Sequence, residues 1–178
     1  MENLVYVGIG SNLGDPIIQC QKGIDDICTL PNVKVTIISS LYKTSPVDFS
    51  HPTDWFINGV IELSTQYTPE ELLKILLAIE VNFGRVRNPG TKNEPRPLDL
   101  DILFFGQQIL NTPLLTIPHP RLHERRFVLE PLKEIAPNVI HPLFKKIVCG
   151  LYEDLKDSHL VQKLESYPAR DFNKYPTV

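Results

Sequence analysis

The chain has 178 residues, of which 42% are hydrophobic and 22% are charged, and its formal net charge is −3. This length suits one domain with a substantial core, so we expect residues 1–178 to form a single domain. The negative charge argues against bulk binding to nucleic acid or to an anionic membrane, and no apolar run approaches the ~20 residues of a membrane span. The three widely spaced cysteines indicate neither a disulfide framework nor a zinc site, and there is no signal-type N-terminus, so we expect a cytoplasmic protein.

Apolar patterning predicts alternating strands and helices along the first part of the chain. In chain order these are a strand at 4–9, a helix that begins at Pro16 and is ended by Pro31-Asn32, strands at 33–42 and 56–65, a helix at 69–83 and a strand at 98–103. Asp15 precedes Pro16 as a helix N-cap, and Thr68 opens a capping box that is completed by Glu71. Gly84 occupies a C-terminal cap position. This order predicts an α+β, ferredoxin-like βαββαβ sandwich with an antiparallel sheet.

The pattern after residue 103 predicts additions to that core. Gly106 and Gln107 indicate a turn into a short extra strand, and the prolines around His119 indicate extended backbone. We expect a helix at 125–136, begun or interrupted by Pro131, and a last helix at 151–164. The tail after Tyr167 is expected to fray.

Two aspartates mark the most distinctive part of the sequence. Asp99 and Asp101 are two residues apart in a predicted strand, so their carboxylates project to one side while Leu98, Leu100 and Ile102 face the core. Paired carboxylates repel unless a proton or cation intervenes, and Mg²⁺ prefers one or two carboxylates together with phosphate oxygens. The alternative is a solvated strand edge, although charged pairs are depleted from strand interiors.

Arginines surround this pair in the sequence. Six of the seven arginines lie between Arg85 and Arg126, a stretch with a local net charge of +3 in an acidic chain. The forked guanidinium group suits phosphate oxygens, so the stretch predicts binding of a small polyanion such as a nucleoside triphosphate with its metal. Arg85, Arg96 and Arg125 are the favoured contacts. A loop kept soluble by charge is the alternative.

Other candidate residues have weaker signals. Glu80 lies at the edge of the apolar stripe near a helix C-terminus, where a negative charge is unfavourable unless a cation or ligand compensates; it is otherwise a surface glutamate. His119 lies between two prolines and is either a fixed site residue or a structural histidine. Phe56 and Asn58 share a strand face, a combination that can hold a flat heterocycle but is equally compatible with a core position.

These segments together resemble the 6-hydroxymethyl-7,8-dihydropterin pyrophosphokinase family of folate biosynthesis. The resemblance runs in order over residues 4–140 and is most specific in Arg96-Pro97-Leu98-Asp99-Leu100-Asp101-Ile102-Leu103 and in Pro118-His119-Pro120-Arg121. The other matching segments are Gly10-Ser11-Asn12-Leu13-Gly14, Tyr42-Lys43-Thr44-Ser45-Pro46, Phe56-Ile57-Asn58, Glu80, Gly84-Arg85-Val86-Arg87 and Arg125-Arg126-Phe127.

The resemblance implies transfer of a pyrophosphoryl group from ATP to the hydroxymethyl oxygen of the dihydropterin, with AMP as the other product. It implies that Asp99 and Asp101 hold two Mg²⁺ ions, and that Arg85 and Arg96 are catalytic. Expected ATP contacts are Glu80, Arg87, His119 and Arg125. Expected pterin contacts are Thr44, Pro46, Val47, Phe56, Asn58 and Phe127, with the two phenylalanines on either face of the ring.

The chain departs from many family members at Asn93-Glu94, where they have Trp-Gly, and at Leu114, where some have arginine near the adenine. The expected partners are these small molecules, with no nucleic acid and no membrane, and we expect a monomer, either free or joined to another folate enzyme. Two alternatives from other classes are an RNA-binding module of the same topology and a nuclease or glycosyltransferase that uses the aspartate pair.

Overall fold

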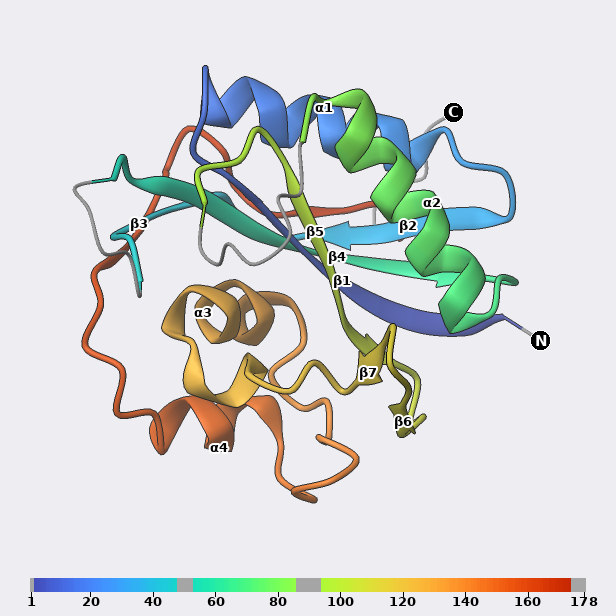
Figure 1. Cartoon of the computed structure of the whole chain (residues 1–178). Coiled ribbons are helices and arrows are strands. Elements are labelled where there is room, and N and C mark those ends of the chain that lie inside the picture. The colour runs from blue at the N-terminus through green and yellow to red at the C-terminus, as the bar shows by residue number, and fades with distance from the viewer. Residues whose placement is uncertain (1, 48–52, 86–93, 174–178) are drawn as a thin grey trace.

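The computed structural model describes residues 2–47, 53–85 and 94–173 (Figure 1). Its strands are β1 (Asn3–Ser11), β2 (Val33–Ile38), β3 (Tyr42–Thr44), β4 (Phe56–Thr65), β5 (Asp99–Phe105), β6 (Leu110–Asn111), β7 (Thr116–Ile117), β8 (Val161–Lys163) and β9 (Arg170–Asp171). Its helices are α1 (Pro16–Cys28), α2 (Pro69–Asn82), α3 (Arg126–Ile135) and α4 (Val148–Glu153), with a 3-10 turn η1 at Leu122–Glu124.

The main sheet has the strand order β5-β1-β4-β2-β9, and β3 and β8 extend it beside β4. The pairs β1–β4, β1–β5 and β2–β4 are all antiparallel. The helices α1 and α2 lie on one face of the sheet, and α3 and α4 lie on the other (Figure 1). This arrangement confirms the predicted α+β, ferredoxin-like sandwich. The short β6–β7 hairpin confirms the extra strand expected after Gly106.

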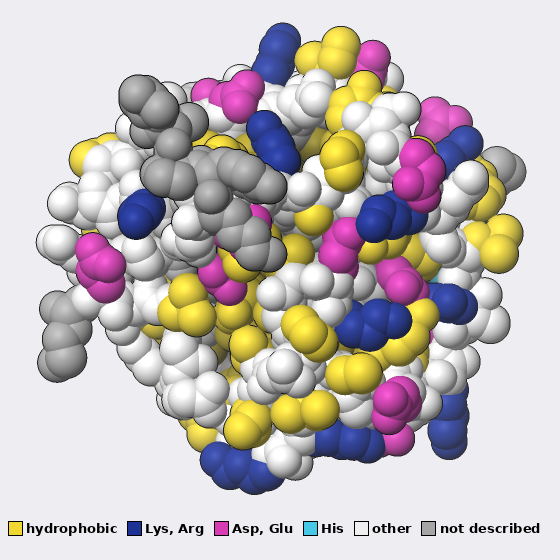
Figure 2. Space-filling model, turned by 180° about the vertical axis from the view of Figure 1, so that it is seen from behind, with side chains coloured by type: hydrophobic (Ala, Val, Ile, Leu, Met, Phe, Trp, Pro, Cys, Tyr) yellow, Lys and Arg dark blue, Asp and Glu magenta, His cyan; other side chains and the backbone are white. Residues whose placement is uncertain are grey.

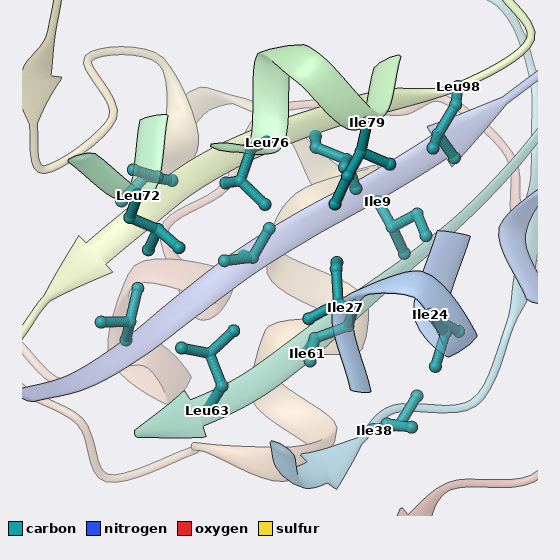
Figure 3. Close-up of a cluster of buried hydrophobic side chains, with 14 of the residues drawn as sticks. Ile9, Ile24, Ile27, Ile38, Ile61, Leu63, Leu72, Leu76, Ile79 and Leu98 are labelled. Atoms are coloured by element: carbon teal, nitrogen blue, oxygen red, sulfur yellow. The ribbon is translucent and has the colours of Figure 1, made fainter. Parts of the chain in front are cut away.

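One face of the sheet, which we call the sealed face, is covered by α1 and α2. Leu72, Leu76 and Ile79 of α2 and Ile24 and Ile27 of α1 point toward the sheet (Figure 3). They pack against the alternate strand residues Ile9, Ile61, Leu63 and Leu100. The period-two alternation of the strands therefore directs their apolar side chains to this core, as the sequence predicts.

The opposite face, which we call the site face, is only partly covered. Tyr6, Val60, Leu103 and Phe104 pack there against α3 and α4. Farther along the same strands, this apolar cluster ends among the described residues, and the positions that point to this face include Gly8 and Gly10 of β1, Asn58 and Phe56 of β4, and Asp99 and Asp101 of β5.

The predicted helix ends are confirmed. The Asp15 side chain accepts hydrogen bonds from the backbone N–H groups of Ile17 and Ile18, and Thr68 and Glu71 form the capping box at the start of α2. Gly84 follows α2 with a φ of 87°, which a residue with a side chain rarely adopts, so glycine ends this helix at no steric cost.

The single strand expected at 33–42 is wrong, because the structure divides it into β2 and β3 at residues 39–41. The Ser40 backbone N–H and its hydroxyl group both donate to the carboxylate of Glu134 in α3, each at 2.8 Å. The bonds to Glu134 take the place of strand pairing at Ser40. After this break, β3 pairs with the start of β4.

The predictions for the C-terminal part are also wrong in two places. The helix expected at 151–164 is the shorter α4, and residues 161–163 form β8, which pairs with β3. The tail after Tyr167 is expected to fray, but it contains β9, which pairs with Ile37 and Ile38 of β2; residues 174–178 of this tail lie outside the described residues. The helix expected at 125–136 is confirmed as α3, with Pro131 inside it.

Side chains on the face shown in Figure 2 have mixed charge, with lysine and arginine next to aspartate and glutamate. The three cysteines are free thiols. Within the described ranges, no helix combines the length and the apolar character needed to span a bilayer.

Candidate active site

The uncovered end of the site face has a floor of glycine backbone. Gly10 of β1 lies opposite Asn58 of β4 on one side and opposite Asp99 of β5 on the other, and Gly8 lies opposite Asp101. A Cβ atom at Gly10 would come within 2.6 Å of the Asn58 side-chain oxygen. Glycine therefore leaves the space between Asn58 and the aspartates open.

A pocket lies above this floor, and we call it the aromatic pocket. It is lined by Thr44, Ser45, Val47, Phe56, Asn58, Arg96, Asp99, Asp101, Arg125 and Phe127. These residues come from β3, β4, β5 and the start of α3, so segments about 80 residues apart in sequence meet here. Seven of the predicted site residues are thereby brought together with Asp99 and Asp101.

An arginine guanidinium group packs against each of the two phenylalanine rings in this pocket. The guanidinium carbon of Arg96 lies 5.7 Å from the centre of the Phe56 ring, and that of Arg125 lies 5.6 Å from the centre of the Phe127 ring. These are cation–π distances, which hold the positive groups close to the apolar walls. The pocket can therefore contact a flat ring and an anionic group at the same time.

The amide of Asn58 is held in place by β3. Its nitrogen donates to the Thr44 hydroxyl oxygen at 2.7 Å, and both residues are buried. The strand pairing also places Thr44 opposite Phe56. This bond fixes which end of the Asn58 amide is oxygen and leaves one amide hydrogen and one carbonyl oxygen for a ligand.

Asp99 is surrounded by positive charge. It forms ion pairs with Arg85 and with Arg96, whose Nε atom lies 3.0 Å from the carboxylate. Asp101 lies beside it, and burial together with the Asp99 charge raises the Asp101 pKa to about 7. These aspartates are the carboxylates that could hold a divalent cation; in the described part of the chain, no group of three or more His, Cys, Asp or Glu is arranged for a metal.

Glu80 is almost completely buried, with 1% of its surface exposed, rather than on the surface. Its carboxylate accepts hydrogen bonds from Arg85 at 2.5 Å and from the Leu100 backbone N–H at 2.8 Å. Burial opposes the charge on Arg85, but Asp99 and Glu80 raise its pKa. Glu80 therefore orients Arg85 toward Asp99, and its predicted contact with the nucleotide stays a prediction.

A second pocket, which we call the apolar pocket, lies at the outer edge of β5. It is lined by Leu73, Leu77, Leu100, Asp101, Ile102, Thr112, Pro113, Leu114, Leu115, Thr116, His119 and Pro120. Asp101 is shared with the aromatic pocket. Burial, followed by the charge of Arg125, lowers the pKa of His119 to about 4, so His119 is neutral near pH 7.

Some predicted residues lie elsewhere or outside the description. Arg87 falls outside the described residues. Pro46 is described, but it does not appear among the residues that line either pocket. Arg126, which is not among the predicted contacts, donates to Tyr152 of α4 at 3.1 Å.

Sequence reasoning missed a residue that supports the site. Asn12 exchanges two bonds with Arg96: its side-chain oxygen accepts from the Arg96 N–H at 2.8 Å, and its own N–H donates to the Arg96 carbonyl at 3.1 Å. The available signal was an asparagine in the glycine-rich turn after β1, a residue type that often bonds neighbouring backbone. Ser45 was also missed as a lining residue, although it lies between predicted contacts.

The comparisons with known proteins agree with this geometry. The family model of 7,8-dihydro-6-hydroxymethylpterin-pyrophosphokinase matches residues 6–137. A 2-amino-4-hydroxy-6-hydroxymethyldihydropteridine pyrophosphokinase from Pseudomonas aeruginosa is 44% identical over 140 residues, which is 78% of this chain and 83% of that protein. The protein of the same name from Bacillus subtilis is 39% identical over 139 residues, with 78% and 81% covered.

Similar structures belong to longer chains. A Plasmodium falciparum HPPK-DHPS triple mutant aligns with a TM-score of 0.69 at 15% identity, over 86% of this chain and 43% of that one. This chain therefore spans less than half of the solved chain, and at that identity the match shows the fold alone.

The family match covers the strands and helices that build the site, and the Pseudomonas and Bacillus relatives are covered over most of their length. The chain therefore belongs to the 7,8-dihydro-6-hydroxymethylpterin-pyrophosphokinase family, the ATP-dependent enzymes that transfer a pyrophosphoryl group to the hydroxymethyl group of the dihydropterin in folate biosynthesis.

Proposed function

We propose that this chain performs the pyrophosphokinase reaction where the aromatic pocket and the apolar pocket meet. The observation that carries the proposal is that Asp101 lines both pockets, with Asp99 beside it. Two substrates bound in adjoining pockets would have their reacting groups close to this carboxylate pair. Such positioning supplies much of the rate in phosphoryl transfer.

The aromatic pocket is the proposed site for 6-hydroxymethyl-7,8-dihydropterin. Phe56 and Phe127 supply aromatic walls, and the fixed amide of Asn58 can read the hydrogen-bonding edge of the ring. Thr44 and Val47 line the same side. We keep Pro46 as a proposed neighbour of the ring.

The apolar pocket is the proposed site for the adenosine part of ATP. Leu73 and Leu77 of α2 face Leu115 across it and offer apolar contacts to the base. His119 lies in the same pocket, and its Nδ1 atom accepts from the Arg121 backbone N–H at 3.2 Å, so the neutral ring carries its proton on Nε2 and can donate a hydrogen bond to ribose or phosphate. The triphosphate would then extend past Asp101 into the cluster of arginines.

Asp99 and Asp101 are the proposed ligands of Mg²⁺, with two ions expected. Their fit is supported by the donor chemistry, because carboxylate oxygens are what Mg²⁺ prefers, and by the raised pKa of Asp101, which shows that its charge is poorly compensated. With only these two carboxylates, the triphosphate oxygens would complete the coordination. When bound, the ions would neutralise charge on the phosphates.

The arginines are the proposed electrostatic catalysts. In the reaction, the hydroxymethyl group loses its proton to solvent as its oxygen forms a bond to the β-phosphorus of ATP, and the bond from that phosphorus to the α–β bridging oxygen breaks, so that AMP leaves with the bonding electron pair. Arg85 and Arg96 are already oriented by Asp99, and Arg125 lies on the opposite wall with Phe127. They would stabilise the charge that shifts to the leaving oxygen. Arg87 stays a proposed ATP contact.

We propose that residues 1–178 act as one domain and one chain. The proposal of one domain is supported by strands β8 and β9, which join the C-terminal part to the main sheet. The fungal relative named folic acid synthesis protein fol1, from Pneumocystis carinii, is 38% identical over 153 residues, which is only 20% of that protein. Linkage to another folate enzyme is therefore a second proposed arrangement. The free thiols support a cytoplasmic location.

The test is to incubate the protein with ATP, Mg²⁺ and hydroxymethyldihydropterin and to measure AMP. We expect AMP to form only when the pterin is present and to be abolished by chelation of the metal. AMP production that does not depend on pterin would indicate another phosphate chemistry at the aspartate pair. No AMP under any metal condition would exclude the proposed reaction.

A further inference from the structure

The C-terminal segment crosses the site face outside the part matched by the family model, which ends at residue 137. After α4 the chain runs beside α3 and up to β3, where it forms β8 (Figure 1). Residues 157–160 of this segment contact both walls of the aromatic pocket, and we call them the C-terminal brace.

One end of the brace holds the start of α3. The Asp157 carboxylate accepts a hydrogen bond from the Arg126 backbone N–H at 2.8 Å. Arg126 is the first residue of α3, directly before Phe127, and this helix has no side-chain cap from its own N-cap residue. A carboxylate at a helix N-terminus is stabilising both as a cap and through the helix dipole. Asp157 is therefore a cap supplied from 31 residues away.

The other end of the brace holds the opposite wall. The second Asp157 oxygen accepts from the His159 backbone N–H at 2.8 Å and also contacts the His159 ring. Leu160 then exchanges two hydrogen bonds with Ser45: the Ser45 N–H donates to the Leu160 carbonyl at 3.0 Å, and the Leu160 N–H donates to the Ser45 hydroxyl at 3.1 Å. Ser45 lines the aromatic pocket.

The hydrogen bonds of the Asp157 carboxylate connect the two walls of the aromatic pocket. Its side chain is only 8% exposed, so its hydrogen bonds are shielded from solvent. The described contacts of the segment reach α3, β3 and β2, whereas the apolar pocket is built by α2, β5 and the 112–120 segment. Loss of the brace should therefore disturb the aromatic pocket more than the apolar pocket, to which the brace is linked through Arg125 at the start of α3.

We propose that Asp157 is a positioning residue that sets the distance between the Phe127 wall and the Ser45 wall of the aromatic pocket, and thereby the affinity for the pterin. This inference rests on the proposed function, because it takes the aromatic pocket as the pterin site. Asp157 acts through Phe127 and Ser45 and does not itself touch a substrate.

The experiment compares Asp157→Ala with the wild type by calorimetry, using the pterin in the presence of Mg²⁺ and a non-hydrolysable ATP analogue, and then the analogue alone. We expect the Kd for the pterin to rise about 10-fold, the scale of one charge-assisted hydrogen bond. The Kd for the analogue should rise less than the Kd for the pterin, since the pocket proposed for adenosine is built by other elements and, in the described part of the chain, the brace reaches the proposed phosphate contacts through Arg125, next to Arg126. Asp157→Asn keeps one acceptor oxygen, so its Kd for the pterin should lie between those of the wild type and of Asp157→Ala. Asp157→Asn also replaces the alanine variant if that protein does not fold.

Asp154→Asn is the matched control, because Asp154 is a carboxylate in the same segment, with a 66% exposed side chain and an ion pair to Lys146. It should leave both affinities unchanged. Equal loss of affinity for both ligands, or a lower melting temperature with unchanged pterin affinity, would overturn the inference and leave Asp157 as a stability cap only.

Phe127→Ala in the same series separates the two proposals. If it weakens pterin binding while Asp157→Ala does not, the inference fails and the proposed pterin site stands. If Phe127→Ala leaves pterin binding unchanged, the proposed pterin site fails, and the inference fails with it.

Discussion

The two faces of the central sheet use the same strands for opposite purposes. On the sealed face, Ile9 and Leu100 are completely covered by α1 and α2. On the site face, their immediate neighbours Asp99 and Asp101 line an open pocket together with arginines, and Gly10 lies opposite Asp99. Because successive strand residues point to opposite faces, each strand contributes to the core and to the site in alternation. Stability and catalysis should therefore be separable by substitutions one residue apart.

The largest expected effect is on the site face. Asp101→Ala should reduce turnover by roughly 10³-fold or more, the scale seen when a group that controls developing charge is removed. The melting temperature should stay the same or rise, because the substitution removes repulsion between two carboxylates. Steady-state AMP release and thermal unfolding check both parts. A variant that keeps its turnover would show that Asp101 holds no catalytic ion.

A substitution on the sealed face should lower stability and leave substrate binding unchanged. Leu76→Ala removes a fully buried side chain of α2 and should lower the free energy of unfolding by ~2–5 kcal/mol. Both substrate affinities should be retained in the folded fraction at low temperature. Denaturant unfolding measures the first effect, with Val81→Ala, an exposed position of the same helix, as the control. A large loss of pterin affinity in Leu76→Ala would show that the two faces are coupled.

A substitution at Gly10 tests whether the glycine floor of the site face is needed for pterin binding. Gly10→Ala would place a Cβ atom 2.6 Å from the Asn58 side-chain oxygen, so the amide must move. We expect pterin affinity to fall about 10-fold, the scale of a lost hydrogen bond in a buried site. Gly8→Ala is the matched control, because its Cβ would meet only the Leu103 side chain at 3.4 Å. Equal effects at both positions would show that general crowding, rather than Asn58, is responsible.

The smallest effect concerns the part of the site face beneath α3. Burial, together with the charge of His123, lowers the pKa of His141 to about 4, and the ring stacks on Phe144 with centres 4.3 Å apart. Because the folded pKa lies below the ordinary value of 6.5, the unfolded state binds more protons between these values. Stability should therefore be full above about pH 6.5 and should decline as the pH falls toward 4.

His141→Asn should flatten this pH dependence of stability. Its side-chain oxygen can replace the His141 Nδ1 atom, which accepts from the Leu143 and Phe144 backbone N–H groups. Unfolding by denaturant at pH 7 and at pH 4.5 measures the difference. An unchanged slope in the variant would assign the acid loss of stability to another group.

Local signals in the sequence predicted much of this molecule. The caps at Asp15 and Thr68 and the shared direction of Asp99 and Asp101 depend only on neighbours within a few residues, and the structure contains all of them. The apolar pocket was not predicted, because Leu73 looks like any helix-stripe residue until its packing against the 112–116 segment is known.

Long-range hydrogen bonds explain the other differences. The break after β2 depends on Glu134, which is 94 residues away from Ser40. The absence of a helix at residues 161–163 depends on pairing with β3, and the neighbouring bond from Leu160 spans 115 residues. No window of local sequence contains such partners, so propensity alone favoured a continuous strand in one case and a helix in the other.

The pairing of β8 with β3 has a consequence for synthesis on the ribosome. Residues 42–44 leave the exit tunnel long before residues 161–163. The edge of β3 that pairs with β8 therefore stays unpaired while the intervening chain is made. Loop closure over such a distance is slow compared with formation of the early helices. A nascent chain stalled before residue 157 should hence expose this strand edge to chaperones.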